Sequence, residues 1–434
     1  MVFFLFVPSC KYPLPYEEQE ALADKPSFFY DALDNLTDVI VYDIFSPPVA
    51  SRVYAYPCIA AYQSLSPTNP ELRDLSGLLK DLGPTPQPVD SSFVSYNLSA
   101  IYAFFKVSKA LIFSEEKLQI QINTFNLQLD EIGISENVKN ASLKYGEQVA
   151  DHILEWASKD NYKQTRTYPK FSITDDASKW KPTPPSYMEA IEPNWREIRT
   201  LVLDSASQFK PAPPTSFSTD KGSQFYIETM EVYETVNKLD EEQKKIASFW
   251  DCNPYVMNQT GHIMFATKKI TPGGHWMGIA NIATRDKKLS LAKSIETTTL
   301  VSIGLFDAFI SCWDEKYRSG LIRPESVINA HIDESWKPLL QTPPFPEHTS
   351  GHSVISTTAA HLLTAIIGDN FAYTDDVEQK YGLPIRDYDS FLQASSEAAI
   401  SRLYGGIHYM PAISDGVEQG ENVGKYIIDK LIGE

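Results

Sequence analysis

The amino-acid sequence predicts an all-α protein, built as helical bundles with long proline-rich loops. Two observations predict this class. Apolar residues recur at the spacing of one helix face over most of the chain, and the alternating patterns typical of β-strands are scarce. At 434 residues with 43% hydrophobic content, the chain can also bury a large core.

Residues 1–29 are predicted to be a truncated lipoprotein-type signal followed by a linker. The opening MVFFLFVPSC is an apolar run too short to span a bilayer. Val7-Pro8-Ser9 before Cys10 resembles the end of a bacterial lipoprotein signal, in which the cysteine accepts a lipid. The protein would then be exported to the periplasm or cell surface and attached to the membrane through Cys10. A plain apolar N-terminus is the alternative.

Residues 30–434 are predicted to form a single α-helical domain. Leu118, Ile122, Phe125, Leu129 and Ile132 fall on one helix face, although 118–122 alone would also alternate as a strand. We expect further helices over residues 138–157, 240–249, 288–316, 352–367 and 387–404, and surface loops or lids over the Pro-rich stretches 168–193 and 209–217.

The charge balance argues against a nucleic-acid partner. The chain has 38 basic and 56 acidic residues, a formal charge of -18, so electrostatics oppose binding to a phosphate backbone. An acidic protein that binds a small anion must concentrate positive charge locally, and the last third of the chain contains such a cluster. The cysteines Cys58, Cys252 and Cys312 show no spacing typical of a disulfide framework or a zinc site.

The first segment of this basic cluster runs from Lys316 to Pro324. Lys316 ends a long apolar helix, and Pro324 disfavours helical geometry at Arg323. With Gly320 as a hinge, the chain can bring the Arg323 guanidinium back toward the Lys316 ammonium. A planar fork and a point charge together suit an oxyanion. A basic helix end that complements the helix dipole is the alternative interpretation.

The second segment contains Ser350, Gly351 and His352 at the start of a predicted helix. Thr349 or Ser350 is a natural N-cap. A helix start directs free backbone N–H groups at a bound anion, and Gly351 lets the anion approach closely. His352 in the first turn is a candidate acid/base. An ordinary capped helix with a partly buried histidine would share this pattern.

The third segment contains Arg402 and His408, separated by Gly405-Gly406. The two side chains would not converge on an unbroken helix. The glycine pair ends or bends the helix, so His408 can face the pocket that Arg402 enters. A neutral imidazole is a good metal ligand and also a good nucleophile at phosphorus.

In this order, K-x6-R-P, S-G-H and S-R-x5-H resemble the signature of the superfamily that contains the vanadium haloperoxidases and the type 2 phosphatidic acid phosphatases. Gly274-His275-Trp276 and the helix from Asp307 to Lys316 look like bacterial vanadium haloperoxidases. The resemblance covers roughly residues 240–420. It implies an active-site bundle over about residues 240–434 and vanadate as the cofactor, with phosphate able to occupy the same site.

The resemblance also implies roles for individual residues. His408 would bind vanadium, His352 would act as acid/base on hydrogen peroxide, and Lys316 would assist attack by a halide. The oxyanion would be held by Lys316, Arg323, Ser350, Gly351 and Arg402. The implied reaction is vanadate-dependent oxidation of a halide by hydrogen peroxide to hypohalous acid, which would halogenate a small organic acceptor.

The residue pattern also allows an acid phosphatase, because phosphate and vanadate share shape and charge. His408 would then form a phosphohistidine, and His352 would protonate the leaving alcohol. Trp313 lies one helical turn before Lys316 on the same face, and the Trp313/Phe345 pair looks like that of marine bacterial iodoperoxidases. An apolar, polarisable wall suits iodide or bromide better than chloride, although both rings could simply be core aromatics.

Several neighbouring residues are candidates for supporting roles. Asp251 or Asp307 could orient Arg402 or His408, since a buried carboxylate needs a partner. His275 and His348 could line the entrance, or be ordinary satisfied histidines. A different class of protein, a lipid-anchored surface binding protein, would account for Cys10 and the aromatic loops. It would not explain the ordered basic motifs.

Overall fold

The computed structural model describes residues 14–260, 263–266 and 268–433. Within these residues the chain forms 15 α-helices and two short antiparallel hairpins. The hairpins pair β1 (Met257–Thr260) with β2 (Ile263–Ala266), and β3 (Tyr373–Asp375) with β4 (Arg386–Tyr388). The predicted all-α class is therefore confirmed.

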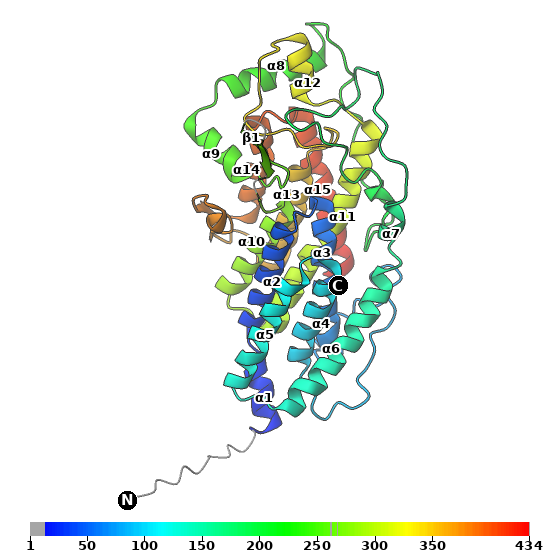
Figure 1. Ribbon diagram of the computed structural model, residues 1–434, viewed down its shortest axis with the longest axis vertical. Helices are drawn as coiled ribbons and strands as arrows, with labels where there is room; N and C mark the ends of the chain where they lie inside the picture. The colour runs from blue at the N-terminus through cyan, green and yellow to red at the C-terminus, as the bar shows by residue number, and fades with distance from the viewer. Residues whose placement is uncertain (1–13, 261–262, 267, 434) are drawn as a thin grey trace, which may run out of the picture.

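The N-terminal half is a bundle around one fully buried helix. Every residue of α3 (Pro47–Leu65) is buried, because α4, α6 and α11 pack around it (Figure 1). The ambiguous segment 118–122 is helical, within α5. The other helices of this half are α1 (Tyr16–Ala23), α2 (Pro26–Tyr42), α4 (Tyr96–Leu111), α5 (Glu115–Glu131) and α6 (Glu136–Ala157).

The predicted linker before residue 30 is wrong over its second half. α1 covers residues 16–23, and α2 begins at Pro26. Ala23, Phe28 and Phe29 are buried in the main core, so this segment is held by packing rather than extended in solvent. The charged residues and prolines of this segment were interpreted as a linker. Pro26 is instead the first helical residue of α2, a position that proline suits. Cys10 lies outside the described residues.

A long irregular segment connects the two halves. After α7 (Tyr162–Thr165), the described stretch 166–223 contains one short 3-10 helix, η1 (Trp195–Glu197), and no other helix or paired strand. Its backbone is fixed to the bundle by hydrogen bonds from Trp180 N–H to the Gly320 carbonyl and from Ile191 N–H to the Pro344 carbonyl. The two predicted loop regions, 168–193 and 209–217, both lie in this segment.

The C-terminal half centres on α13, against which α11, α14 and α15 pack. Its short helices α8, α9 and α12 lie at the end of the molecule away from α1 (Figure 1). The helices of this half are α8 (Gln224–Asn237), α9 (Glu241–Phe249), α10 (Pro272–Asp286), α11 (Leu291–Ser319), α12 (Pro324–His331), α13 (Gly351–Ile367), α14 (Phe391–Tyr404) and α15 (Met410–Leu431), with the 3-10 helix η2 (Gln379–Tyr381).

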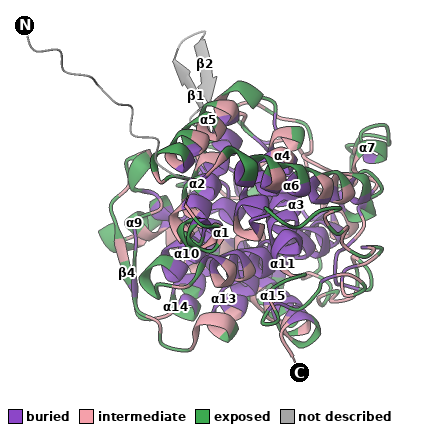
Figure 2. Cartoon of the chain, turned by 90° about the horizontal axis from the view of Figure 1, so that it is seen from below, coloured by how far each residue is buried: buried purple, intermediate pink, exposed green. Residues whose placement is uncertain are grey.

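α11 joins the two halves into one core. It packs against α3 on one side and α13 on the other, and buried residues concentrate around these helices (Figure 2). α11 is long and apolar enough to cross a membrane, but 94% of the relevant window is buried within the fold, as is usual for a central core helix. Its C-terminal end carries Lys316 to the candidate site.

Candidate active site

Four helix ends meet at one end of the C-terminal bundle and carry the predicted oxyanion-binding residues. α11 ends at Gly320, whose left-handed conformation (φ 59°) turns the chain back on itself. Arg323 is the extended N-cap of α12, as Pro324 requires. Gly406 (φ 74°) turns the chain between α14 and α15, so that His408 follows the turn while Arg402 stays on α14.

The turn at Gly405-Gly406 brings the two predicted histidines and the two arginines together. Arg323 Nη1 lies 3.1 Å from His408 Nε2. Arg402 Nη1 lies 2.8 Å from His352 Nε2. Each guanidinium thus faces one imidazole, and Arg402 is also near enough to His408 to help lower the pKa of that histidine.

Both arginines are buried, and neither makes an ion pair with a carboxylate in the part of the chain that the structure describes. Arg323 and Arg402 are at most 1% exposed, and they donate to backbone carbonyls: Arg323 to Phe345 and Ile407, Arg402 to Trp250. Within the described residues, Arg323 Nη2 and both Nε and Nη2 of Arg402 have no hydrogen-bond partner. Because burying an unpaired charge is costly, these N–H groups indicate a site for an anion.

Lys316 is held differently. Its ammonium is fully buried and donates to the carbonyls of Pro346, Glu347 and Thr349. These three bonds use all three ammonium donors, so Lys316 must release at least one of them to bind an oxyanion. Burial lowers the pKa of Lys316 to about 8.

Glu347 is a site residue that sequence reasoning missed. Its Oε1 lies 2.8 Å from His408 Nδ1 and also accepts the Tyr409 N–H. Since Arg323 donates to Nε2, Nδ1 is the protonated nitrogen and donates to Glu347. Burial raises the pKa of Glu347 to about 7, although Arg323 and Lys316 oppose the shift. Glu347 lies three residues before Ser350, and this closeness to the second segment was the one feature of the sequence that could have identified it.

The start of α13 supplies the neutral donors. Ser350 is the N-cap, and its Oγ accepts the Ser353 N–H at 3.3 Å, which leaves its hydroxyl proton free to donate. A Cβ added at Gly351 would lie 3.8 Å from Trp313 and 3.9 Å from Lys316. The first turn of α13 therefore faces the ammonium and the indole directly.

The two histidines are electrostatically alike. Burial and the neighbouring arginines lower the pKa of His352 and of His408 well below the usual value, with Arg402 acting on His352 and Arg323 on His408. Both are neutral near pH 7. A neutral His408 has a lone pair on Nε2, which accepts from Arg323 here and can bind a metal or phosphorus centre once Arg323 releases it.

Trp313 and Phe345 form an apolar wall beside these groups. Their ring centroids are 5.0 Å apart, and Phe345 lies 5.0 Å from Lys316 Nζ and 5.1 Å from the Arg323 guanidinium carbon. Both rings line a narrow cavity of about 30 Å³, together with Pro47, Tyr255, Phe309, His352, Ile407 and His408 among others. A wider cavity, about 440 Å³, belongs to the 165–194 loop and includes none of the predicted site residues.

Of the two candidate carboxylates, only Asp251 is near an arginine of the site. Asp251 accepts a hydrogen bond from Lys269 at 2.6 Å, and its charge partly offsets the burial that lowers the pKa of Arg402. The prediction that Asp307 orients Arg402 or His408 is wrong. Its carboxylate accepts three backbone N–H groups, from Leu201, Val202 and Leu203, so it fixes the irregular segment instead.

His275 and His348 do not line an entrance, because both are at most 1% exposed. His348 is 3.7 Å from Asp415, and burial lowers its pKa to about 4. His275 stacks on Trp250 with centroids 4.6 Å apart and bonds to Asp375. Because the Trp250 carbonyl accepts from Arg402, His275 lies one layer behind the site.

The chain is similar to known proteins over most of its length. The VCPO second helical-bundle domain matches residues 296–432, a range that contains the five predicted oxyanion-binding residues and the two predicted active-site histidines, His352 and His408. Among curated proteins none matches the chain. The structure is similar to that of a bacterial vanadium-dependent iodoperoxidase, with 51% identity, a TM-score of 0.89, and coverage of 94% of this chain and 96% of that one.

Two more distant structures share the fold. They are the holo and apo forms of a bacterial vanadium-dependent chloroperoxidase, each 14% identical, with TM-scores of 0.67 and 0.66. The matches cover 90% and 89% of this chain, and 93% and 94% of those chains.

Proposed function

This chain belongs to the vanadium-dependent haloperoxidases, and from that premise we propose that it uses hydrogen peroxide to oxidise iodide in preference to bromide or chloride. Vanadate is the cofactor, and when bound it supplies a Lewis acid that activates peroxide without itself changing oxidation state. We assign vanadate to this site because buried arginine N–H groups without partners in the described chain lie beside a neutral His408.

The residues present fit vanadate. Arg323 and Arg402 offer three N–H-bearing nitrogens without partners in the described chain, and Ser350 adds a hydroxyl at a helix N-terminus. His408 would hold the metal through Nε2, because Glu347 binds the proton on Nδ1 and fixes the tautomer. Lys316 can contribute once it releases a backbone carbonyl.

The proton of hydrogen peroxide goes to His352 in this proposal. Its lowered pKa keeps the imidazole neutral, and therefore able to accept a proton. Arg402 donates to Nε2 of His352. An anion that accepts the Arg402 N–H groups would free this nitrogen at the moment when peroxide binds.

The preference for iodide rests on the apolar wall and on the relative. Trp313 and Phe345 present two polarisable ring faces beside the cationic groups, which suits a large, weakly hydrated anion. The bacterial protein that is 51% identical is an iodoperoxidase. Replacing Phe345 by histidine adds a polar group to the wall, so we expect Phe345→His to lower the ratio of iodide to bromide kcat/KM by about tenfold, roughly 1.4 kcal/mol of discrimination.

The test is oxidation of iodide, bromide and chloride by the purified apo-protein with hydrogen peroxide, before and after addition of orthovanadate. Hydrolysis of p-nitrophenyl phosphate is measured in the same buffers. Vanadate-dependent oxidation with iodide fastest supports the proposal. Phosphate release that vanadate inhibits, without any halide oxidation, would assign the site to phosphatase chemistry instead, and an unchanged halide ratio in Phe345→His would remove the role of the wall.

We also propose that the protein is exported and attached to a membrane by a lipid on Cys10. The support is the sequence Val7-Pro8-Ser9-Cys10 alone. In a bacterial host, the wild type should fractionate with membranes and carry a lipid at a mature N-terminal cysteine, while Cys10→Ala should not. A soluble wild type with an unmodified Cys10 would contradict this.

A further inference from the structure

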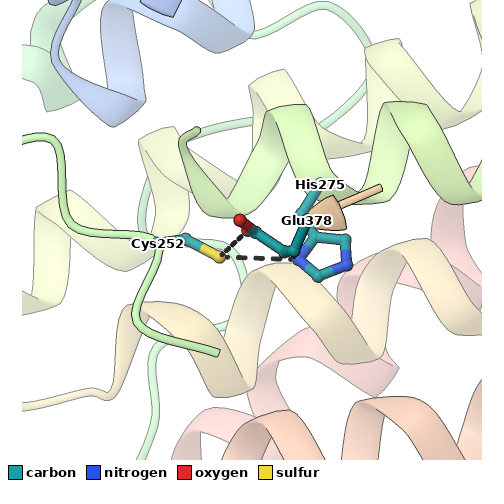
Figure 3. Close-up of side chains that lie close together, drawn as sticks. All are labelled: Cys252, His275 and Glu378. Atoms are coloured by element: carbon teal, nitrogen blue, oxygen red, sulfur yellow. Dashed lines mark hydrogen bonds and ion pairs between the residues drawn. The ribbon is translucent and has the colours of Figure 1, made fainter. Parts of the chain in front are cut away.

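A second buried cluster lies behind the oxyanion site. Cys252 Sγ, His275 Nδ1 and Glu378 Oε1 converge on one point (Figure 3). Among the residues that the structure describes, this is the one group of three or more Cys, His, Asp or Glu side chains whose ligand atoms come this close together. The three residues come from the segment after α9, from α10 and from the turn before η2.

We infer that this cluster is a zinc site with ligands Cys252, His275 and Glu378. The first argument is the spacing of the donor atoms. Sγ lies 3.5 Å from Nδ1 and 3.5 Å from Oε1, and Nδ1 lies 3.4 Å from Oε1. For tetrahedral Zn²⁺, bond lengths of about 2.3 Å to sulfur and about 2.0 Å to nitrogen and oxygen put these pairs about 3.5, 3.5 and 3.3 Å apart.

The second argument is the hydrogen bond on the far side of the imidazole. His275 Nε2 lies 2.8 Å from Asp375 Oδ2, and neither side chain is exposed. A zinc-bound histidine characteristically donates its other N–H to a carboxylate, which orients the ring and strengthens its basicity. Asp375 is itself fixed, because its Oδ1 accepts the Val377 N–H at 3.1 Å.

The third argument is burial. The carboxyl groups of Asp375 and Glu378 are buried on either side of His275, and buried carboxyl groups are paired or bound to a metal. All three ligands are at most 4% exposed, and the stacked Trp250 covers the imidazole face.

The metal would join segments that are far apart in the sequence. Cys252 is 23 residues from His275 and 126 from Glu378, which explains why no short zinc motif marks the site. Cys252 also follows Trp250, whose carbonyl accepts from Arg402. A zinc ion here would fix the loop that supports the arginine of the oxyanion site. This inference does not depend on vanadate being bound.

The test is metal content of the full-length protein, purified with a thiol reductant, supplied with zinc and then dialysed against metal-free buffer. We expect about one zinc per chain by mass spectrometry. Co²⁺ in place of zinc should give the thiolate charge-transfer band of a cysteine-bound ion. Cys252→Ser and Glu378→Gln should lower zinc content at least tenfold, while Cys58→Ser, which alters another buried cysteine, should not.

The wild type alone keeps the inference falsifiable if the ligand variants fail to fold. A wild type that retains less than a tenth of an equivalent of zinc, and shows only the spectrum of hydrated cobalt, would overturn it. His275 would then be held between Asp375 and Glu378 without a metal. Equal zinc content in Cys252→Ser and Cys58→Ser would also overturn the ligand assignment.

Discussion

The two halves of the molecule bury arginines in opposite ways. In the N-terminal bundle, Arg52 Nε lies 2.7 Å from Asp160 Oδ2, and Tyr56 donates to the same carboxylate. In the C-terminal bundle, Arg323 and Arg402 are buried at least as deeply, but they donate to backbone carbonyls and histidines and keep nitrogens without partners in the described chain. The comparison distinguishes Arg52, which stabilises the fold, from Arg323 and Arg402, which have N–H groups available to bind an anion.

The largest effect should come from removing the metal ligand. His408→Ala should reduce vanadate-dependent iodide oxidation to the rate without enzyme, because the other neutral imidazole of the site, His352, faces Arg402 and is assigned to the proton of hydrogen peroxide. Its melting temperature should stay within a few degrees of the wild type. The matched control, His361→Ala, changes a half-buried histidine of α13 and should keep activity; comparable loss in both variants would mean that the site is placed wrongly.

The next largest effect is on the free energy of unfolding, which should distinguish Arg52 from Arg402. Arg52→Ala leaves Asp160 buried without its partner and should cost about 3–5 kcal/mol of unfolding free energy. Arg402→Ala removes a buried cation that makes no ion pair within the described residues, so apo-protein stability should fall less than in Arg52→Ala, by about 1–3 kcal/mol for the Trp250 carbonyl left unpaired. Urea denaturation of both variants checks this. A larger loss in Arg402→Ala than in Arg52→Ala would remove the distinction on which the comparison depends.

Glu347 is an acidic residue of the site, and it supports vanadate binding indirectly by holding His408. Glu347→Gln should weaken vanadate affinity about 10–100-fold, as is usual when the partner of a metal-binding histidine is altered. Activity should largely return at saturating vanadate. Glu228→Gln, which changes another buried glutamate, on α8, serves as the control. Unchanged affinity in Glu347→Gln would show that Arg323 alone fixes the tautomer of His408.

The smallest effect concerns pH. The folded pKa of Lys316 is about 8, below the unfolded value of about 10.4. The ammonium that attracts an anion is therefore lost as pH rises through 8, and anion affinity should fall by up to tenfold per pH unit above it. The unfolded chain binds more protons in this range, so apo-protein stability should rise between pH 8 and 10. Lys316→Arg keeps its charge and should flatten both slopes, whereas identical slopes would assign them to another group.

Much of the site was predictable because its residues lie at helix ends that the sequence marks. Pro324 fixed the extended conformation of Arg323, and the glycine pair before His408 predicted its turn. The Glu347 to His408 contact joins residues 61 positions apart, and no local pattern pairs them. Asp307 was misassigned because its place on an apolar helix predicts burial but not direction, and its partners lie in an irregular segment.

Helix α15 was among the helices not predicted from the sequence, and the reason is its glycine content. It contains Gly416, Gly420 and Gly424, residues that weaken helix propensity. A Cβ at Gly420 would stand 2.4 Å from the Val354 carbonyl oxygen, so these glycines allow α15 to pack closely on α13. The packing of α15 on α13 outweighs the low helix propensity of its glycines, but the sequence shows only the low propensity.

The most direct test of the comparison is the melting temperature of the apo-protein as orthovanadate is added, for the wild type, Arg52→Gln and Arg402→Gln. A ligand that binds only the folded state raises the melting temperature. We predict a rise in the wild type and in Arg52→Gln, whatever the starting stability of that variant, and a rise at least several-fold smaller in Arg402→Gln. An equal rise in all three proteins would contradict the claim that the unpaired arginines of the C-terminal bundle form the vanadate site.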